Sequence, residues 1–347
     1  MRDPSLAEIQ SGLQTYCEQL FPEKQNLQVQ NLISLNVGWE SIIYRFDLHS
    51  DLTSLRQSET LILRIYPGSD AIEKSQREFE GLQHLYDQRY PVPRVYAIQR
   101  EHSPFELPFI LIENIPGETL WPVLDRAEPE RAAALLSQFC ELFAQLHNLD
   151  WRPFAPGNES EQQPAPYEFV DRYFAMVQNA AAAFPDLAPF LPIMLWLEER
   201  RSLVPCHRPS PIHWDFHPGN VILRPDGGMS VIDWTQIQVS DPRFDLGWTL
   251  LLAGAYSGDQ VRNLILREYQ RFASLQIEQL AFFEVANAVK RIGSVLISLS
   301  AGADQMGMRP DAVANMRRDF PALQRVYDLL VDRTGLRIAE IEALLAG

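Results

Sequence analysis

Two neighbouring stretches carry an unusual density of acid, imidazole and amide side chains: Pro211-Ile212-His213-Trp214-Asp215-Phe216-His217-Pro218-Gly219-Asn220-Val221-Ile222-Leu223 and, after a polar turn, Met229-Ser230-Val231-Ile232-Asp233-Trp234. The apolar runs at 221–223 and 231–232 are typical of short strands. The turn signal Pro225-Asp226-Gly227-Gly228 between them predicts a hairpin. We expect this hairpin to bring Asn220 and Asp233 to the same end.

The spacing of the polar residues indicates a specific chemistry. His213 and Asp215 form a His-x-Asp pattern, Asn220 follows that Asp by five positions, and Asp233 follows Asn220 by thirteen. This is the spacing of a kinase catalytic loop and of the metal-binding Asp after it. Phosphoryl transfer needs a carboxylate near the acceptor hydroxyl and Mg²⁺ on the phosphate oxygens. We therefore predict Asp215 as the catalytic base, with Asn220 and Asp233 as Mg²⁺ ligands.

Two other interpretations compete with this one. Any one of these polar residues alone is typical of a tight turn, because Asp, Asn, Pro and Gly all favour turns. His213, Asp215 and His217 also alternate, so on an extended strand they would share one side, as the ligands of a metal-dependent hydrolase would. The breaker Pro218-Gly219 follows at once, however, and no other His lies in a comparable motif. The sequence favours the kinase interpretation, in which His213 is structural and bonds backbone near Asp233.

Two further acids follow where a helix is expected to begin, in Ser240-Asp241-Pro242-Arg243-Phe244-Asp245. Asp241 or Asp245 would cap that helix, and either could also accept backbone N–H groups of the catalytic loop. We expect structural support from both residues, with plain capping as the alternative.

The N-terminal part of the chain is predicted to form a small sheet. A helix behind the capping-box pattern Ser5-Leu6-Ala7-Glu8 precedes three predicted antiparallel strands at Leu27–Leu35, Ser41–Leu48 and Leu61–Tyr66. The connection Asn36-Val37-Gly38-Trp39-Glu40 could cover a ligand, with Gly38 near its phosphates. Because it holds one glycine rather than three, an ordinary hairpin turn is the alternative.

One cation stands inside the third of these strands, in Leu61-Ile62-Leu63-Arg64-Ile65-Tyr66. An unpaired buried guanidinium is costly, so Arg64 needs an anionic partner unless it reaches water from an edge strand. The next predicted helix carries Glu78 among apolar positions, and Glu80 is a second candidate. A strand cation paired with a helix glutamate anchors the nucleotide phosphates in kinases. We predict this role for Arg64 and Glu78.

A change of composition marks a candidate boundary. Pro91–Ala97 and Pro108–Glu113 are two further predicted strands, and the breaker-rich segment 114–120 follows them. We therefore expect an N-terminal nucleotide-binding lobe over residues 1–114 and a helical lobe over 115–347 that holds the catalytic loop and the acceptor site. Helices are expected in this second lobe at Glu128–Leu149, Tyr167–Phe184, Asp186–Arg201, Phe244–Ala253, Ser257–Phe272, Ile277–Leu299, Asp311–Val331 and Arg337–Leu345.

The composition of the chain limits the classes of partner that we expect. The formal net charge of −15 gives the chain no overall positive field that would attract nucleic acid or an anionic membrane, so we expect neither as a partner. It slightly favours a cationic or amine-bearing acceptor. Cys17, Cys140 and Cys206 lack CxxC spacing, which indicates a reducing compartment, and Met1-Arg2-Asp3-Pro4-Ser5 does not begin a signal peptide. We expect a soluble, cytoplasmic protein.

Taken together, these motifs resemble the aminoglycoside phosphotransferase and choline kinase family, relatives of the protein kinases. The resemblance covers most of the chain and is carried by LILRIY with REFE, FILIENIPGETL, FAQLHNLDW, HWDFHPGN, VIDW and DPRFDLG, of which HWDFHPGN with VIDW is the specific pair. It implies an α+β, two-lobed, protein-kinase-like fold: a small N-terminal antiparallel sheet with one anchoring helix, and a large, mainly helical C-terminal lobe.

The resemblance also implies ligands and their residues. ATP and Mg²⁺ would bind between the lobes, and GTP is the alternative nucleotide. Glu113 and Ile115 would contact adenine through their backbone groups. Ile222 is expected to lie under the base. Two departures stand out: Trp214 replaces a usually small residue, and Arg64 replaces the commoner Lys, as in choline kinases.

The predicted function is transfer of the γ-phosphoryl group of ATP to a hydroxyl of a small molecule, which could be aminoglycoside-like, an amino alcohol or a sugar. Acids such as Asp171, Glu284 or Asp304 could hold an amine of the acceptor, although the sequence favours surface solvation as the role of each. A nucleotide-binding pseudokinase that acts as a binding module is the alternative, and the intact Asp215, Asn220 and Asp233 count against it.

Overall fold

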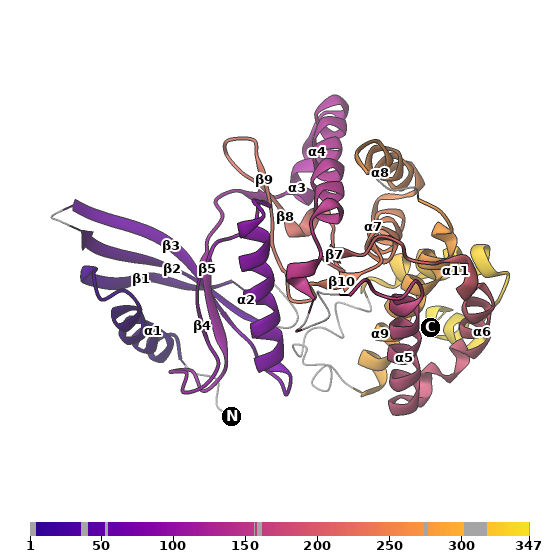
Figure 1. Cartoon of the computed structure of the whole chain (residues 1–347), viewed down its shortest axis with the longest axis horizontal. Helices are drawn as coiled ribbons and strands as arrows, with labels where there is room; N and C mark the ends of the chain where they lie inside the picture. The colour runs from indigo at the N-terminus through magenta and orange to yellow at the C-terminus, as the bar shows by residue number, and fades with distance from the viewer. Residues whose placement is uncertain are drawn as a thin grey trace. The chain divides into compact units, whose positions relative to one another are not determined.

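The structure, a computed structural model, describes residues 5–35, 41–52, 55–155, 157, 162–273, 277–301 and 318–346. The chain forms two compact units (Figure 1): unit 1 comprises Met1–Glu118 with Ile222–Gln236, and unit 2 comprises Thr119–Val221 with Ile237–Gly347. The predicted boundary at 114/115 treated the second lobe as continuous. In the structure, the segment 222–236 is instead grouped with the N-terminal unit.

Unit 1 contains the predicted antiparallel sheet. Its strands are β1 (Gln25–Leu35), β2 (Ile42–Leu52), β3 (Leu55–Ile65), β4 (Val95–Gln99) and β5 (Phe109–Glu113), in the order β1-β2-β3-β5-β4. The first three strands extend further than their apolar runs predicted. Polar side chains on paired strands bond each other there, as where Thr60 Oγ1 donates to Asp47 Oδ1 at 2.8 Å, so pairing continues without apolar side chains.

Two helices accompany this sheet. Helix α1 (Leu6–Leu20) begins with the predicted capping box of Ser5 and Glu8, and it buries Ile9, Leu13 and Cys17 against the sheet core. Helix α2 (Ala71–Asp87) has one buried face, and Glu78 lies on this face between the buried Ser75 and Leu82. This placement turns the carboxylate of Glu78 inward, where it must find a partner.

The segment 222–236 belongs to unit 1 through a small set of contacts. Strands β8 (Val221–Leu223) and β9 (Met229–Val231) form the predicted hairpin, and β6 (Glu118–Thr119) adjoins β8 in the order β6-β8-β9. The backbone N–H of Val231 donates to the carbonyl of Pro91 at 2.9 Å. The ring of Trp234 packs edge-on against Tyr90, with centroids 5.8 Å apart.

Gly117 lies where the chain passes this hairpin, and we expect its replacement to be strongly destabilising. Its φ is +144°, and an added Cβ would overlap the backbone oxygen of Leu223 and lie 2.7 Å from Ile222 Cγ2. Backbone strain and overpacking together predict that Gly117→Ala lowers the free energy of unfolding by about 3 kcal/mol in denaturant titration. Gly254→Ala is the control, since its Cβ would meet Arg262 at an ordinary 3.4 Å. Equal stability of the two variants would contradict the clash.

Unit 2 is mainly helical. Its α-helices are α3 (Leu120–Arg126), α4 (Pro129–Asn148), α5 (Glu168–Ala183), α6 (Leu191–Arg200), α7 (Pro242–Ser257), α8 (Asp259–Phe272), α9 (Leu280–Ala301), α11 (Phe320–Thr334) and α12 (Ala339–Ala346). Its short strands β7 (Ser210–Ile212) and β10 (Gln238–Ser240) pair antiparallel on either side of the excursion into unit 1.

Some predicted helices differ in their bounds. The helix predicted over 186–201 is a 3₁₀ helix, η3 (Pro185–Phe190), followed by α6. Pro189 and Pro192 lack the backbone N–H that a continuous α-helix would require there. The helix predicted from Asp311 to Val331 is described only from residue 318 onward, as α11. The short helix α3 was not predicted.

Helix α7 is the centre of unit 2. It is buried over most of its length and packs against α8, α9 and α11. A Cβ at Gly247 would lie 2.9 Å from Asn287 Nδ2 and 3.2 Å from Phe283, so glycine permits the close approach of α7 and α9. The N-terminal half of α7 supplies the residues that hold the catalytic loop.

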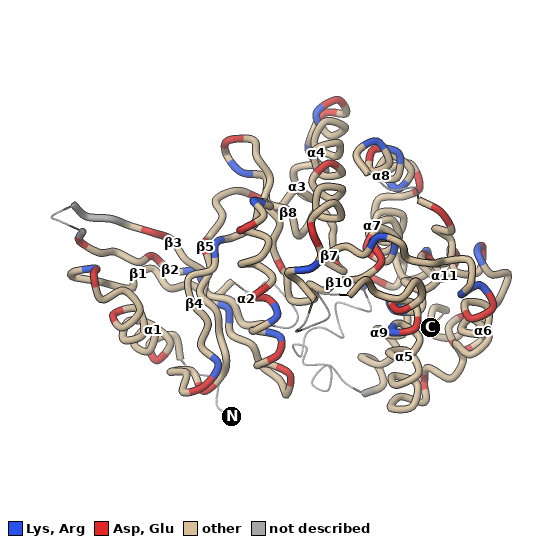
Figure 2. The backbone as a smooth tube through the Cα atoms, viewed as in Figure 1, with Lys and Arg blue, Asp and Glu red and all other residues tan. Residues whose placement is uncertain are grey.

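No helix within the described residues is long and apolar enough to cross a membrane. Figure 2 shows acidic and basic residues interspersed on the helices of unit 2, as along α8.

Candidate active site

The catalytic-loop segment lies in unit 2 between β7 and the 3₁₀ turn η5 (Pro218–Asn220). Trp214 adopts a left-handed backbone conformation with φ +62°. Such a conformation costs of order 1–3 kcal/mol for a non-glycine residue and persists only where surrounding contacts impose it. The loop must therefore be held by specific hydrogen bonds.

Asp245 provides those hydrogen bonds. This residue of α7 is fully buried, and its carboxylate accepts the backbone N–H of His213 at 2.7 Å and that of Trp214 at 2.9 Å. His147 Nε2 lies 3.2 Å from the same carboxylate, and His147 Nδ1 lies 2.7 Å from the hydroxyl of Tyr269. The loop backbone is thus fixed to α7 and, through His147, to α4 and α8.

Asp241 has a different position. Its carboxylate accepts the backbone N–H of Arg243 at 2.9 Å and caps α7, and it also pairs with the Arg243 guanidinium at 2.6 Å. Of the two acids considered from the sequence, Asp245 therefore contacts the loop and Asp241 caps the helix.

The carboxylate of Asp215 is surrounded by donors. Trp248 Nε1 donates to Oδ1 at 2.8 Å, Asn220 Nδ2 lies 3.2 Å from Oδ2, and His217 Nε2 lies 3.5 Å from Oδ2. Burial raises the pKa of Asp215, but the contacts with His217 and Trp248 outweigh it and hold that pKa well below its usual range. The side chain is 35% exposed, so this carboxylate is both ionised and reachable.

Asn220 is oriented by the same loop. Its Nδ2 donates to the backbone oxygen of Asp215 at 3.0 Å, as well as approaching the Asp215 carboxylate. Within the part of the chain that the structure describes, its Oδ1 accepts no hydrogen bond. A neutral amide oxygen left without a donor suits a hard cation such as Mg²⁺.

Asp233 lies in unit 1, directly after β9. It has a positive φ of +67°, and its Oδ1 accepts Arg64 Nη2 at 2.6 Å and Thr235 Oγ1 at 3.4 Å. Its Oδ2 accepts no hydrogen bond from the described residues, and the side chain is 36% exposed. One carboxylate oxygen is therefore available to a cation, which fits the residue predicted to bind Mg²⁺.

Arg64 and Glu78, predicted as a pair, lie together in the core of unit 1. Arg64 Nη1 contacts Glu78 Oε1 at 3.0 Å, and the hydroxyl of Tyr66 donates to Glu78 Oε2 at 2.6 Å. Burial disfavours the charged guanidinium, but the carboxylates of Glu78 and Asp233 raise the pKa of Arg64 above its usual value. Arg64 is consequently a fixed cation beside the one engaged oxygen of Asp233.

The residues predicted to meet the nucleotide base also lie in unit 1. The backbone N–H and carbonyl of Ile115 make no hydrogen bond with any described residue, whereas the N–H of Glu113 donates to Arg94 at 2.8 Å. Ile222, in β8, is partly exposed beside Gly117. Ile115 thus retains free backbone groups for a base edge. Gly38 lies outside the described residues.

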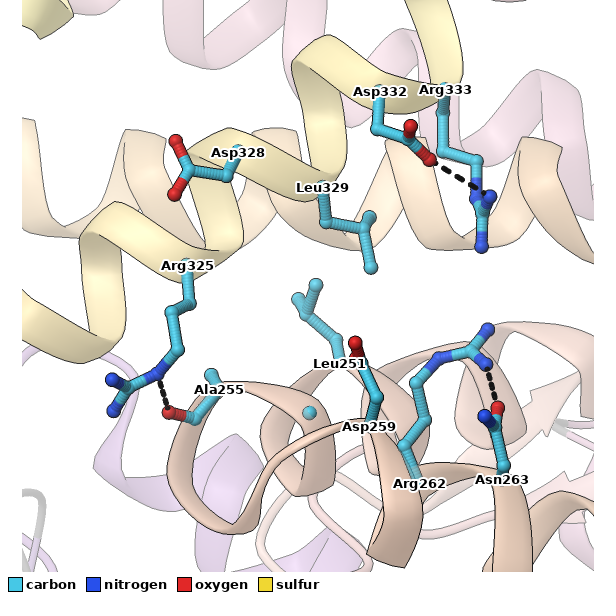
Figure 3. A pocket seen from close by; sticks show the side chains of 11 residues that line it. Leu251, Ala255, Asp259, Arg262, Asn263, Arg325, Asp328, Leu329, Asp332 and Arg333 are labelled. Carbon is cyan, nitrogen blue, oxygen red and sulfur yellow. Dashed lines mark hydrogen bonds and ion pairs between the residues drawn. The ribbon is translucent and has the colours of Figure 1, made fainter.

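Of the acids considered for an amine-bearing acceptor, Glu284 is already paired. It is 1% exposed and binds the guanidinium groups of Arg262 and Arg333, the latter at 2.9 Å. Both arginines line a cavity of about 560 Å³ formed by residues of α7, α8 and α11 (Figure 3). The buried charge of Glu284 therefore serves to hold these two arginines.

Asp171 is paired as well. It lies on α5 and makes a bidentate ion pair with Arg201, with distances of 2.5 and 2.6 Å. Asp304 lies outside the described residues.

The geometry of the two histidines gives little support to the metal-hydrolase alternative. His213 is fully buried and its Nδ1 accepts the backbone N–H of Asp215 at 3.3 Å, while His217 Nδ1 accepts that of Gly219 at 3.0 Å. Across the described ranges, no group of three or more His, Cys, Asp or Glu side chains is placed to hold a metal ion. Both histidines therefore act as acceptors that shape the loop.

Two residues at this site were not identified from the sequence. Trp248, the donor to Asp215, lies 33 positions away in a strongly apolar helix and looks like a core residue. His147 stands in FAQLHNLDW, one of the motifs that carry the family resemblance, and that motif was the available signal for its role.

The model of the phosphotransferase enzyme family matches residues 47–283. A search of curated proteins gives no match. Among solved structures, a candidate aminoglycoside phosphotransferase from Ralstonia eutropha JMP134 is 16% identical, with a TM-score of 0.65 and coverage of 93% of this chain and 98% of that one.

Two other structures are informative. A thermostable variant of an aminoglycoside phosphotransferase in ternary complex with AMP-PNP and hygromycin B is 16% identical, with a TM-score of 0.57 and coverage of 93% of this chain and 99% of that one. A choline kinase from Streptococcus pneumoniae is 17% identical, with a TM-score of 0.53 and coverage of 92% and 99%. These likenesses confirm the predicted protein-kinase-like fold.

Proposed function

The chain belongs to the phosphotransferase enzyme family, and we propose that it moves the γ-phosphoryl group of ATP, with Mg²⁺, to a hydroxyl group of a small molecule. The acceptor oxygen attacks the γ-phosphorus, the bond from that phosphorus to the bridging oxygen breaks, and ADP leaves. The hydroxyl proton passes to Asp215. This is an in-line displacement in which positioning and electrostatics supply most of the rate.

One observation carries this proposal: a single anchored loop holds both an ionised, partly exposed carboxylate and an unengaged amide oxygen. The carboxylate of Asp215 has its pKa well below the usual range, and Asn220 Oδ1 accepts no hydrogen bond from the described residues. A carboxylate in this state is ready to orient an acceptor hydroxyl and to receive its proton.

The nucleotide and metal roles are assigned residue by residue. Asn220 and Asp233 would hold Mg²⁺, which when bound would neutralise charge on the phosphate oxygens. Arg64, fixed by Glu78, would bind the phosphates through a guanidinium suited to bidentate contact. Ile115 would bind the base edge through its backbone. The AMP-PNP complex of the aminoglycoside phosphotransferase supports ATP as the phosphoryl donor. GTP is the alternative donor and is included in the test below.

The cellular compartment is also proposed. Cys17, Cys140 and Cys206 are free thiols buried in the protein, and burial raises the pKa of Cys17 to about 12. Buried neutral thiols fit a reducing compartment that also supplies ATP, so we propose the cytoplasm.

The test is radiolabelled transfer from ATP and, separately, GTP to a panel of amino alcohols, sugars and aminoglycosides, with Mg²⁺ present or chelated. Metal-dependent phosphorylation of at least one acceptor is the expected result. If nucleotide binds in a metal-dependent way but no acceptor on the panel is phosphorylated, the pseudokinase alternative takes precedence. Release of a hydrolysis product with Zn²⁺ instead of Mg²⁺ would favour the hydrolase.

A further inference from the structure

Three residues on one face of helix α7 hold the catalytic loop. Asp245, Trp248 and Thr249 stand at positions i, i+3 and i+4, which lie side by side on an α-helix. Asp245 accepts two backbone N–H groups at the start of the loop, and Thr249 Oγ1 donates to the backbone oxygen of Phe216 at 2.7 Å. Between these contacts, Trp248 bonds the side chain of Asp215.

Trp248 differs from the other two residues because it bonds the reacting group. Its indole N–H donates to Oδ1 of Asp215 at 2.8 Å. Asp245 and Thr249 bond backbone atoms on either side of Asp215, so they hold the path of the loop. The bond from Trp248 acts instead on the orientation of the carboxylate.

The indole of Trp248 is itself held in one direction. The residue is 9% exposed and belongs to the hydrophobic core of unit 2. An indole N–H is a donor only, and a packed tryptophan ring cannot turn it elsewhere. A donor fixed in this way orients its partner before the reaction begins, without reorganisation at the moment of transfer.

The two oxygens of the Asp215 carboxylate have different partners. Oδ1 accepts the short bond from Trp248, whereas Oδ2 has longer contacts, 3.2 Å to Asn220 Nδ2 and 3.5 Å to His217 Nε2. A hydrogen bond to a charged oxygen lowers its affinity for a proton, and a short bond does so more than a long one. Oδ2 is therefore the more basic of the two oxygens.

Building on the proposed phosphotransferase function, we infer that Trp248 is a positioning residue for the transfer: by holding Oδ1, it directs Oδ2 of Asp215 toward the acceptor hydroxyl. The hydroxyl proton passes to Oδ2 while the acceptor oxygen bonds the γ-phosphorus and the bond from that phosphorus to the bridging oxygen of ADP breaks. Without the indole N–H, the carboxylate is free to rotate. The rate of transfer then falls, while acceptor binding is retained.

The same hydrogen bond stabilises the charged form of Asp215, so its loss acts on the pH profile with a known sign. Burial raises the pKa of Asp215, and the contacts with His217, Trp248 and His213 lower it. On the neighbouring helix α9, the ammonium of Lys290 lies 4.8 Å from the ring centre of Trp248. Removal of the N–H alone leaves these three charged or titratable side chains in place. It should raise the pKa of Asp215 and move the acid limb of kcat/KM to higher pH.

The experiment removes the N–H and keeps the ring. Benzothienylalanine, introduced at position 248 by amber suppression, exchanges the indole N–H for a sulfur atom in a ring of nearly the same shape, and Trp248→Phe is the genetic counterpart. We expect kcat to fall about tenfold in both, with KM for the acceptor changed less than about twofold. Trp196→Phe is the matched control. It replaces a partly exposed tryptophan of α6 whose ring contacts the guanidinium of Arg200, and it should behave like the wild type.

Combination with Asp215→Asn shows whether Trp248 acts through that carboxylate. In the Asp215→Asn background, benzothienylalanine at position 248 should lower the remaining rate by less than about twofold, because the group that Trp248 positions is already absent. A further tenfold loss in this background would overturn the inference. So would a wild-type rate and an unmoved acid limb in the single benzothienylalanine variant.

A measurement without turnover separates this inference from the proposed function. NMR titration of the Asp215 carboxyl carbon, assigned by difference from Asp215→Asn, should give a higher pKa in the benzothienylalanine variant than in the wild type. If the wild-type protein phosphorylates no acceptor and this rise is nevertheless observed, the proposed function fails and the positioning of Asp215 by Trp248 stands. An unchanged pKa would overturn the inference whether or not transfer occurs.

Discussion

Replacing Asp215 with Asn is expected to lower the rate constant for phosphoryl transfer by about 10³-fold, while the Kd for nucleotide stays within about twofold. The substitution keeps the shape of the side chain and its acceptor oxygen for Trp248 Nε1, but it removes the group that receives the acceptor proton. Single-turnover transfer with a saturating acceptor measures the rate constant, and isothermal titration with a non-hydrolysable ATP analogue measures the Kd.

Asp259→Asn is the matched control for this variant. Asp259 is an exposed acid at the start of α8 in the same unit, so its neutralisation changes the net charge equally. Its transfer rate should remain near that of the wild type. A rate for Asp215→Asn within tenfold of the control would exclude Asp215 as the base.

The low pKa of Asp215 has a consequence for the pH profile. Because that pKa is held well below the usual range, the carboxylate stays ionised from roughly pH 5 to 9, and no step in kcat/KM from its titration is expected there. The stability it contributes is present above its unfolded-state pKa and is lost only as pH falls through the lower folded-state value.

Loss of the His217 contact should reverse part of this shift. In His217→Asn a group that lowers the pKa of Asp215 is removed, so that pKa rises and the acid limb of kcat/KM moves to higher pH. The shift is limited because the carboxylate is partly exposed to solvent. An acid limb that stays in place, or moves to lower pH, would show that another group controls it.

The sequence predicted the local features of the fold well because local patterns determine them. Short runs rich in branched and aromatic residues predicted the strands of unit 1, and the turn Pro225-Asp226-Gly227-Gly228 predicted the β8–β9 hairpin. The assignment of 222–236 to unit 1 was missed. It depends on contacts such as Arg64 with Asp233, 169 positions apart, which no local pattern reports.

In the candidate site, too, residues close together in the sequence were predicted, and residues that only the fold brings together were missed. Asp215 and Asn220 were found together because five positions separate them in one loop. Trp248 was missed because a tryptophan in an apolar helix is normally a core residue, and only the fold brings its N–H to Asp215.

Arg64→Met is expected to lower the free energy of unfolding by about 3–5 kcal/mol, because it leaves the Glu78 carboxylate buried with only the Tyr66 hydroxyl as a side-chain donor. Glu78 is 1% exposed, so water cannot replace the lost guanidinium. Asp233 also loses its cation, at 2.6 Å in the wild-type protein. Denaturant titration followed by circular dichroism measures the change.

The double variant Arg64→Met with Glu78→Met separates the structural from the functional role of this pair. Removing both charges eliminates the uncompensated carboxylate, so much of the stability should return relative to Arg64→Met alone. Nucleotide affinity should not return, because the proposed phosphate-binding guanidinium is still absent. Arg64→Lys, which retains a cation of the kind commoner in the family, should keep both properties in part. Recovery of ATP binding in the double variant would mean that the Arg64–Glu78 pair acts only on stability and that another group binds the phosphates.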